Sequence, residues 1–371
     1  MTTTPDLALN FNAGPSKLPP SVLKTAQENL INYNQTGLSV LEMSHRSSTF
    51  MAIRDHAEAS IRTLLNVPDD YAVLFLQGGA TLQFSMVPLV FCKPGQPVAV
   101  SHTGSWTKKA IAEINKIGRA DVIASSEDTQ FDRIPVINTK LVAATAAYMH
   151  LCSNNTIYGT QYTNFPDSPV PLVADMSSDI LSRPLAISQF HLIFAGAQKN
   201  AGPAGVTLVI AKKSWLHEYD RGNLPLLLNY AKHEQEQSLL NTAPTFSIYM
   251  LGLTAQWLLD HGGVAEIQKR NQEKAALLYY YLDASTFYST MAQPASRSVL
   301  NVCFKSPAAD LDTLFIAEAT QAKLIGLKGH RLIGGLRASL YNALPYSAVE
   351  SLVAFMDQFA KKHTTGHAGV L

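Results

Sequence analysis

Short, uninterrupted apolar runs recur along the first two thirds of this chain, and they constrain its fold more than any other feature. The runs are residues 71–77 (YAVLFLQ), 97–101 (PVAVS), 170–175 (VPLVAD), 191–195 (HLIFA) and 206–211 (VTLVIA). Continuous apolar runs are typical of strands that are covered on both faces, as in a parallel sheet. Longer amphipathic segments separate these runs, so the sequence predicts an α/β protein with a largely parallel sheet.

The pattern changes near residues 261–263 (HGG), which interrupt the helical periodicity. A long helix is predicted to follow, with an apolar stripe formed by Ile267, Ala275, Leu278 and Leu282. A second helical stripe comprises Leu311, Leu314, Phe315, Ala319 and Ala322. Between them, residues 298–304 (SVLNVCF) read as a strand. We therefore predict a large domain over residues 14–262 and a smaller domain over residues 263–371, with residues 1–13 packed on the smaller one.

Composition excludes several classes of function. The net charge is only +1, so no global field attracts nucleic acid or anionic lipid. No apolar run reaches the ~18 residues that a membrane span requires. Charged residues make up 15% of the chain, against about 25% in typical proteins, which favours an oligomer with covered surface.

The three cysteines are too few and too scattered for a disulfide framework or a zinc cluster, so we expect no metal site. They fit a reducing compartment. The first residues show no basic segment followed by an apolar one, as a signal peptide would. We therefore expect a cytoplasmic protein.

Several loops follow the carboxyl ends of the predicted strands, where ligands gather in α/β sheets. Residues 77–81 (QGGAT) let backbone N–H groups approach an anion at the start of a helix, although an ordinary strand-to-helix turn has the same composition. Trp106 follows another strand and could stack on a planar ring or simply fill the core. Asp175 ends a third strand, either as a partner for a cationic ligand or as a helix N-cap.

Lys199 gives the most informative signal. It lies between two apolar strands in residues 195–205 (AGAQKNAGPAG), where little bulk surrounds its amine. A lone loop lysine is usually a solvated charge, but a desolvated lysine has a lowered pKa and can form a Schiff base. The 24 residues from Asp175 to Lys199 suffice for a connection and a strand, so both side chains could meet at one sheet edge.

A set of cationic residues suggests an anionic substrate, because the chain as a whole is almost neutral. The guanidinium group of arginine binds carboxylate and phosphate groups in a bidentate manner. Scattered surface charge is the alternative. The residues concerned are His45, Arg46, His330, Arg331 and Arg337.

Taken together, these segments resemble the phosphoserine aminotransferase family, which belongs to the class V pyridoxal-phosphate-dependent aminotransferases. The resemblance rests on residues 11–15 (FNAGP), 44–47 (SHRS), 76–84 (LQGGATLQF), 104–106 (GSW), 146–159 (AAYMHLCSNNTIYG), 174–179 (ADMSSD), 195–205 (AGAQKNAGPAG), 241–246 (NTAPTF) and 329–345 (GHRLIGGLRASLYNALP). It implies the fold-type I architecture, with a mainly parallel seven-stranded sheet in the large domain and a smaller C-terminal α/β domain.

The resemblance implies that pyridoxal 5'-phosphate is the cofactor. Lys199 would bind it as a Schiff base and then move the proton of the substrate, while Asp175 would pair with the ring nitrogen. Trp106 would stack on the ring, and Thr156 would contact its 3'-oxygen region. The cofactor phosphate would be held by Ala80, Thr81 and Gln198, and by Asn241 and Thr242 of a neighbouring subunit in a homodimer.

The resemblance also implies a reversible amino transfer between L-glutamate and 3-phosphohydroxypyruvate, which gives O-phospho-L-serine and 2-oxoglutarate in serine biosynthesis. The same enzyme would handle 4-phosphohydroxy-L-threonine in pyridoxine biosynthesis. Arg337 would bind the α-carboxylate, and the remaining cations, His45, Arg46, His330 and Arg331, would bind the distal anion. Several relatives carry arginine where this chain has Thr81, which implies one cationic contact fewer.

Two alternative functions are considered from the sequence. A cysteine desulfurase-like enzyme of the same class needs a nucleophilic cysteine on a mobile loop. The three candidates, Cys92, Cys152 and Cys303, lie in ordered-looking segments. A catalytically inactive binding protein would have lost Lys199 or Asp175, and both are present.

Overall fold

The computed structural model describes residues 7–364 of the chain. The parts of the predicted small domain at residues 1–6 and 365–371 lie outside the described residues. None of the helices within residues 7–364 combines the length and apolar character that crossing a membrane requires.

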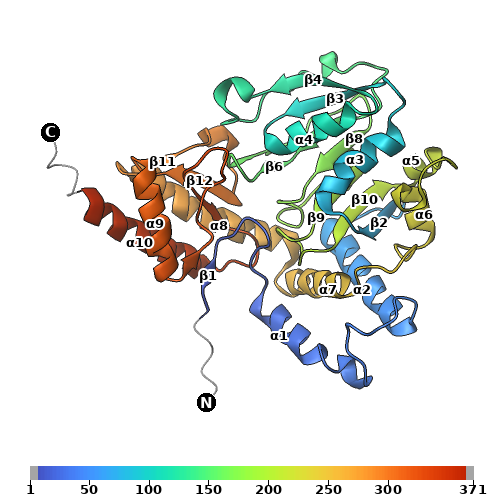
Figure 1. The fold of residues 1–371 in the computed structure, drawn as a ribbon, viewed down its shortest axis with the longest axis horizontal. Helices are drawn as coiled ribbons and strands as arrows, with labels where there is room; N and C mark the ends of the chain where they lie inside the picture. Colours follow the sequence, from blue (N-terminus) through green and yellow to red (C-terminus); the bar gives the residue numbers. More distant parts are fainter. Residues whose placement is uncertain (1–6, 365–371) are drawn as a thin grey trace.

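A seven-stranded sheet forms the centre of the molecule, in the order β2-β10-β9-β8-β5-β3-β4 (Figure 1). Its strands are β2 (Tyr71–Leu76), β3 (Pro97–His102), β4 (Arg119–Ser125), β5 (Met149–Cys152), β8 (Leu172–Asp175), β9 (Leu192–Gly196) and β10 (Thr207–Lys212). The pairs from β9 through β8, β5 and β3 to β4 are parallel, and only β10 runs antiparallel to its neighbours. The predicted fold class is confirmed.

Helices cover both faces of this sheet, because successive side chains of each strand point to opposite faces. In β2, Val73 and Phe75 join one core with helices α2 (Ser48–Leu65) and α7 (Thr245–Asp260). The alternate residues of β2 join a second core. Its helices are α3 (Gly79–Phe91), α4 (Ser105–Ile114), α5 (Lys213–Glu218) and α6 (Tyr230–Gln235). The strands therefore need to be apolar throughout.

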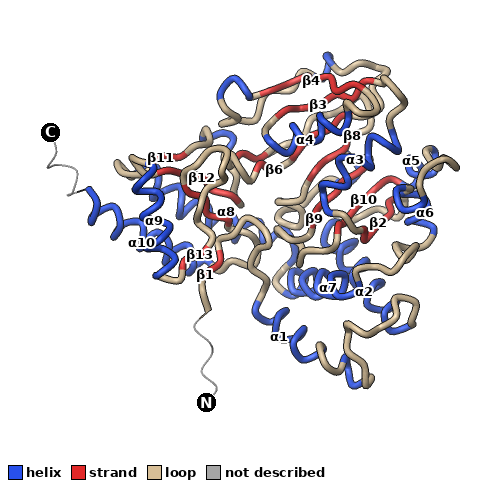
Figure 2. The backbone as a smooth tube through the Cα atoms, in the orientation of Figure 1, coloured by secondary structure: helices blue, strands red, loops and turns tan. Residues whose placement is uncertain are grey.

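The C-terminal part of the chain packs around a third core, beside the sheet at the left of Figure 2. Its elements are α8 (Gly263–Ala284), β11 (Ser289–Thr290), β12 (Asn301–Lys305), α9 (Ala309–Gln321), β13 (Leu324–Ile325), β14 (Leu336–Ser339) and α10 (Tyr346–Thr364). The N-terminal β1 (Leu9–Asn10) pairs with β13, and Phe11 is buried in this core. These contacts support the predicted division at residue 263, which stays a prediction.

Short elements complete the described chain. Helix α1 (Pro20–Asn29) packs against α7, and β6 (Asn154–Asn155) pairs with β7 (Thr160–Gln161) directly after β5.

The structure corrects some details of the sequence prediction. In α9, Leu314 is 39% exposed and Ala322 lies beyond the helix, so these two residues do not belong to the apolar stripe. The stripe predicted for α8 is confirmed, since its four members are buried. Strands β4 and β5 were not among the predicted runs. In β4, the charged residues Arg119 and Asp121 interrupt the apolar sequence.

Candidate active site

Lys199 follows β9 at the carboxyl edge of the sheet, and an N-terminal loop covers its aliphatic stem. The Ser16 hydroxyl donates a hydrogen bond to the Lys199 carbonyl oxygen. A side chain at Gly14 would bring its Cβ within 3.1 Å of the Lys199 Cγ, and the φ of +140° at Gly14 also favours glycine. The stem of Lys199 is thus fixed by packing, while the residue remains partly exposed.

The Lys199 amine lies over an aromatic ring. Its Nζ is 4.7 Å from the centroid of the Trp106 ring, which projects from the first turn of α4. The Trp106 indole donates a hydrogen bond to the Thr156 Oγ1 at 3.2 Å, and this bond fixes the orientation of the ring. The space between the amine and the indole is therefore bounded by rigid groups.

Asp175 ends β8, the strand beside β9, so the parallel pairing brings it near Lys199. Asp175 is only 4% exposed. Burial raises the pKa of its carboxyl group, whereas the Lys199 charge and hydrogen bonds from Ser177 lower it. Burial likewise lowers the pKa of Lys199, and the Asp175 charge opposes that shift. The two side chains lie at one sheet edge, as their spacing predicts.

Ser177 is a residue that the sequence analysis missed. Its backbone N–H and its hydroxyl both donate to the Asp175 Oδ1, at 3.0 and 2.6 Å. The hydroxyl in turn accepts a hydrogen bond from the Gly196 backbone N–H at 3.1 Å. Ser177 therefore favours the ionised form of Asp175 and links β8 to β9. A serine two residues after an aspartate could have signalled a turn of this kind.

Arg337 lies on β14 and reaches the same region from the C-terminal part of the chain. One of its guanidinium N–H groups, at Nη1, donates to the Thr156 carbonyl oxygen at 2.8 Å. Its buried Nε atom has no hydrogen-bond partner among the described residues. A buried, unpaired donor is costly, so this guanidinium is prepared to bind an anion.

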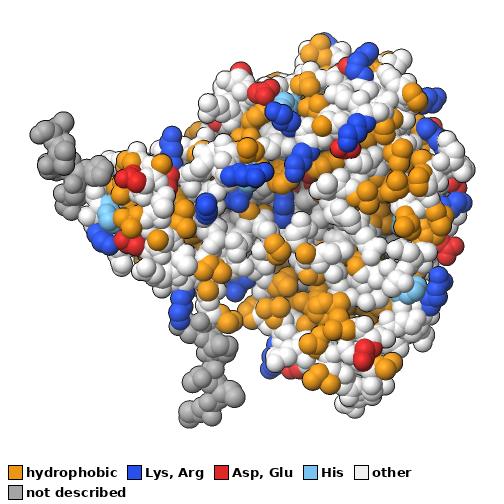
Figure 3. Space-filling view, in the orientation of Figure 1, with side chains coloured by type: hydrophobic (Ala, Val, Ile, Leu, Met, Phe, Trp, Pro, Cys, Tyr) orange, Lys and Arg blue, Asp and Glu red, His pale blue; other side chains and the backbone are white. Residues whose placement is uncertain are grey.

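His330 lies among several cations, one of which is Arg337. The pKa of His330 is lowered by burial and by positively charged neighbours. Those neighbours are Arg337, Arg331 and Lys109. Figure 3 shows Lys and Arg side chains gathered near the middle of one face, where α4 approaches the C-terminal part of the chain. The predicted residues His330, Arg331 and Arg337 therefore lie close together.

The structure does not join the other two predicted cations to this group. His45 and Arg46 precede α2, and Arg46 is exposed. The His45 Nε2 atom is buried and has no hydrogen-bond partner in the described part of the chain. Across residues 7–364, no hydrogen bond or ion pair links either residue to Lys199 or Arg337.

The predicted phosphate turn connects β2 to α3. Gly78 and Gly79 have φ angles of +89° and +63°, and α3 begins at Gly79. Ala80 is half-buried and Thr81 is exposed at the start of this helix, where backbone N–H groups are free to bind an anion.

Three further predicted residues lie at or near this sheet edge. The Asn241 side chain donates to the Gln77 Oε1 at 3.1 Å, which brings residues 241–242 to the phosphate turn of their own chain. Thr242 is exposed. The Gln198 side chain folds over Gly196, where an added Cβ would lie 2.8 Å from the Gln198 Oε1.

The three cysteines are free and buried. Burial raises the pKa of Cys303 to about 12 and also raises the pKa values of Cys92 and Cys152. Thiols of this kind stay protonated and are poor nucleophiles. The geometry gives no support to a cysteine desulfurase-like function.

Comparison with known proteins gives a consistent result. The family described as aminotransferase class-V matches residues 8–352. The phosphoserine aminotransferase of Geobacillus kaustophilus (strain HTA426) is 51% identical over 356 residues, which cover 96% of this chain and 99% of the relative.

Two solved structures are also similar. A phosphoserine aminotransferase studied for radiation damage of its Schiff base has a TM-score of 0.93 at 46% identity and covers 96% of this chain and 100% of its own. The PLP-bound phosphoserine aminotransferase of Trichomonas vaginalis has a TM-score of 0.90 at 36% identity and covers 94% and 99%, respectively. The likeness thus extends over nearly the whole length of each chain.

Proposed function

Because the chain belongs to the class-V aminotransferase family, we propose that it catalyses the phosphoserine aminotransferase reaction. The reaction is a reversible amino transfer between L-glutamate and 3-phosphohydroxypyruvate, which gives O-phospho-L-serine and 2-oxoglutarate. Relatives of that name at about half identity over nearly the full length support it. The Lys199 amine over the Trp106 ring and beside the buried Asp175 is the observation that carries the proposal.

The cofactor is pyridoxal 5'-phosphate, and the residues present fit it. Lys199 would hold its aldehyde carbon, Trp106 would stack on its ring and Asp175 would pair with its ring nitrogen. The glycine turn before α3 offers backbone N–H groups to its phosphate. When bound, this cofactor withdraws electrons from the Cα of the amino acid and so weakens the Cα–H bond.

The chain's own residues supply binding and proton transfer. The lowered pKa of Lys199 favours a neutral amine, which can take the proton from the substrate Cα and return it. Arg337 binds the α-carboxylate through its guanidinium group, whose Nε has no hydrogen-bond partner among the described residues. The Asp175 carboxylate stabilises a protonated ring nitrogen. Both substrates carry an α-carboxylate and a distal anion, so one cationic pocket serves both half-reactions.

The distal anion would be bound by His330 and Arg331 together with His45 and Arg46. Within residues 7–364, neither His45 nor Arg46 forms a hydrogen bond or ion pair with Arg337, so we assign these two residues to the neighbouring site of a homodimer. Exposed apolar side chains before α2 support such an interface, since Ile31 is 83% and Leu41 56% exposed. A cytoplasmic location completes the proposal and accords with three unpaired thiols.

Subunit complementation tests the homodimer. One subunit carries Lys199→Ala and the other carries Asn241→Ala with Thr242→Ala. If residues 241 and 242 serve the partner's cofactor, mixed dimers contain one complete site and regain activity that neither variant has alone. No gain on mixing would mean that Asn241 acts within its own chain, where it contacts Gln77.

A half-reaction screen tests the proposed reaction. The protein loaded with pyridoxal phosphate is mixed separately with glutamate, phosphoserine, aspartate and alanine, and the visible absorbance of the cofactor is followed. Glutamate and phosphoserine should each convert the cofactor rapidly, because both present two anionic groups to the cations around Arg337. Conversion by alanine but not by phosphoserine would refute the proposal, and no conversion at all would favour an inactive binding protein.

A further inference from the structure

The segment from Ser153 to Thr156 follows β5 and carries many polar contacts between the central sheet and the C-terminal part of the chain. At its far end, Thr156 contacts both Trp106 and Arg337. At its near end, Ser153 donates hydrogen bonds to the Asp175 carbonyl oxygen at 3.1 Å and to the Asp179 carboxylate. The segment thus lies between the two groups that define the active site, Asp175 and Arg337.

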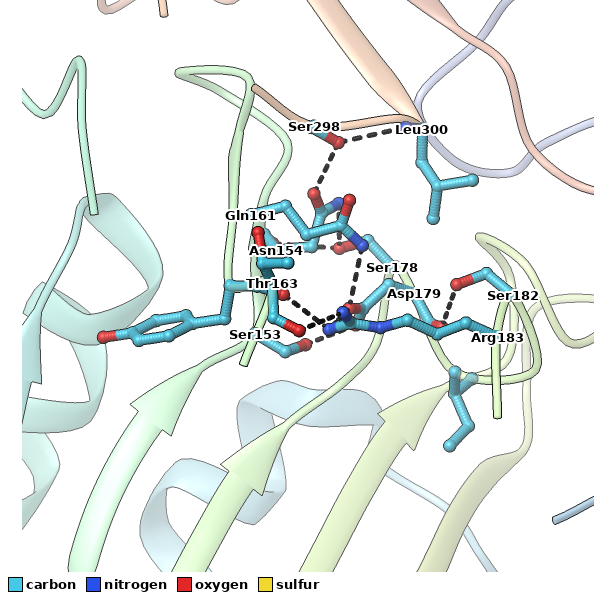
Figure 4. A network of polar contacts seen from close by, with 12 residues as sticks. Ser153, Asn154, Gln161, Thr163, Ser178, Asp179, Ser182, Arg183, Ser298 and Leu300 are labelled. Atoms are coloured by element: carbon cyan, nitrogen blue, oxygen red, sulfur yellow. Dashed lines mark hydrogen bonds and ion pairs between the residues drawn. The ribbon is translucent and has the colours of Figure 1, made fainter. Parts of the chain in front are cut away.

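Asn154 is the one residue of this segment whose side chain contacts both parts of the chain directly (Figure 4). Its Nδ2 donates to the Ser178 Oγ and to the Asn301 Oδ1, each at 2.8 Å. Its Oδ1 accepts a hydrogen bond from the Ser298 hydroxyl at 2.6 Å. Both amide N–H groups and the amide oxygen are therefore used, and the residue is only 1% exposed.

On the sheet side, the contact of Asn154 leads to Asp175. The Ser178 hydroxyl, which accepts from Asn154, also donates to the Asn154 carbonyl oxygen at 2.9 Å. This reciprocal pair fixes the turn that begins three residues earlier at Asp175. The position of the buried carboxylate is thereby tied to Asn154.

On the other side, the contact leads to Arg337. Asn301 begins β12, and its Nδ2 donates to the Ser339 Oγ at 3.0 Å. Ser339 pairs with Asn301 in the register of β12 and β14, and Arg337 precedes it by two residues on the same strand. Residues two apart on a strand share one face, so a shift of Ser339 also moves Arg337.

A neighbouring ion pair, in contrast, does not reach Arg337. Asp179 lies 3.5 Å from Arg183 and accepts a hydrogen bond from the Gln161 side chain. Gln161 accepts in turn from the Val299 backbone N–H. These contacts therefore connect Asp179 to the residues that precede β12. The contacts of Asn154 with Asn301, in contrast, lead through the Asn301 and Ser339 side chains to the strand pair that holds Arg337.

We propose that Asn154 is a positioning residue that sets the separation between Asp175 and Arg337, and so aligns the substrate α-carboxylate with the reacting Cα. The inference rests on the proposed function, because it takes Arg337 as the carboxylate-binding residue. It requires that Asn154 act on substrate binding through Arg337 rather than through general stability.

A double-mutant cycle between Asn154→Ala and Arg337→Ala tests this coupling. Single-turnover rates are measured with glutamate and with the phosphorylated 2-oxo acid at several concentrations. Asn154→Ala alone should lower kcat/KM for both substrates by roughly tenfold, as expected for coupled neighbours. In the Arg337→Ala background, Asn154→Ala should lower kcat/KM by less than about twofold. Equal costs in the two backgrounds would overturn the proposal.

Two further measurements separate positioning from damage to the fold. Ser298→Ala removes one of the two contacts of Asn154 with the C-terminal part and leaves the contact with Asn301. It also removes the acceptor of the Leu300 and Asn301 backbone N–H groups. It should show a weaker form of the same coupling even if Asn154→Ala folds poorly. The affinity of the Asn154→Ala apoprotein for the cofactor is followed by quenching of tryptophan fluorescence. It should stay within about twofold of the wild-type value. A parallel loss of cofactor and substrate affinity would contradict the proposal.

Asn229→Ala provides a matched control. Asn229 is also a buried asparagine with a hydrogen-bonded amide, but its oxygen accepts from backbone N–H groups at the start of α6 and its Nδ2 donates to Asp220. Asn229→Ala should lower the stability of the protein without changing the KM of either substrate. If Asn229→Ala changed both KM values as much as Asn154→Ala does, a specific role for Asn154 would be contradicted. A wild-type protein without glutamate-dependent transfer would instead refute the proposed function, so the two failures are distinguishable.

Discussion

The chemistry that we propose for this site depends on the ionisation of one carboxyl group, that of Asp175. Burial of Asp175 raises its pKa, which alone would favour the neutral acid. The Lys199 charge and the two hydrogen bonds from Ser177 oppose that shift. A neutral acid could not stabilise a protonated ring nitrogen, so the contacts of Asp175 matter as much as its position.

Removal of the Ser177 hydroxyl should therefore impair catalysis at low pH. Ser177→Ala deletes a donor to the ionised form, so the pKa of Asp175 rises and the acidic limb of the kcat/KM profile moves to higher pH. We expect a loss of roughly tenfold near neutral pH, the scale of a hydrogen bond to a charged group. Ser182→Ala is the control, because the Ser182 hydroxyl donates to the backbone carbonyl oxygen of Asp179. An unshifted limb in Ser177→Ala would contradict this account.

The residues that sequence could identify are those with unusual chemistry in an unusual place. Lys199 and Arg337 carry charge beside glycine-rich, apolar segments, and the structure brings both to the sheet edge with Asp175. Ser16 and Ser177 could not be identified in this way, because serine is common in every loop and their roles depend on partners distant in sequence or on backbone geometry. The roles themselves remain proposals.

At the scale of elements, the entry into α4 determines where Trp106 lies. Gly104 precedes the helix with a φ of +149°, and an added Cβ would lie 2.7 Å from a ring carbon of Tyr158. The side chain of Thr107 closes the same turn through hydrogen bonds with the backbone of residues 103 and 104. Only glycine fits here without moving the helix.

Gly104→Ala should thus weaken cofactor binding as well as the fold. The strained backbone costs about 1–3 kcal/mol, and the contact with Tyr158 displaces the first turn that carries Trp106. Gly37→Ala is a matched control, since Gly37 also has a positive φ, of +79°, but an added Cβ there meets no atom within 4 Å. Titration of the apoprotein with pyridoxal phosphate should show a loss of affinity only for Gly104→Ala. Equal affinities would contradict the role assigned to this turn.

The composition of the strands explains why some of them were predicted and others were not. Buried strands such as β2 and β9 consist of continuous apolar residues, so composition alone finds them. The edge strand β4 mixes exposed and half-buried residues, and its pairing with β3 decides its conformation. The antiparallel direction of β10 follows from the short connection after β9, which composition does not reveal.

At the scale of the molecule, a buried lysine in α8 stabilises the turn that joins the C-terminal part to the active-site loop. The Lys274 ammonium donates to the carbonyl oxygens of Leu340, Tyr341 and Leu344. In the same turn, the Asn342 backbone N–H donates to the side chain of Asn200, the neighbour of Lys199. Burial and the nearby Arg270 lower the pKa of Lys274 to about 7.

This lowered pKa predicts a pH-dependent stability. Between about pH 7 and pH 10 the unfolded chain binds the proton more tightly than the folded chain, so the free energy of unfolding rises with pH. The free energy of unfolding of the wild-type protein should rise by up to about 1.4 kcal/mol per pH unit relative to that of Lys274→Met, because methionine does not titrate. Urea unfolding of both proteins across this range measures the difference. A constant difference would show that Lys274 does not change its proton affinity on folding.

The proposed function requires a covalent bond between Lys199 and the cofactor, and peptide mapping after borohydride reduction detects that bond. Reduction of the loaded protein makes the bond permanent, and mass spectrometry then locates the added pyridoxyl group. We predict the label on the peptide that contains Lys199 and its loss in Lys199→Ala. An unlabelled Lys199 in a fully loaded wild-type protein would contradict the account.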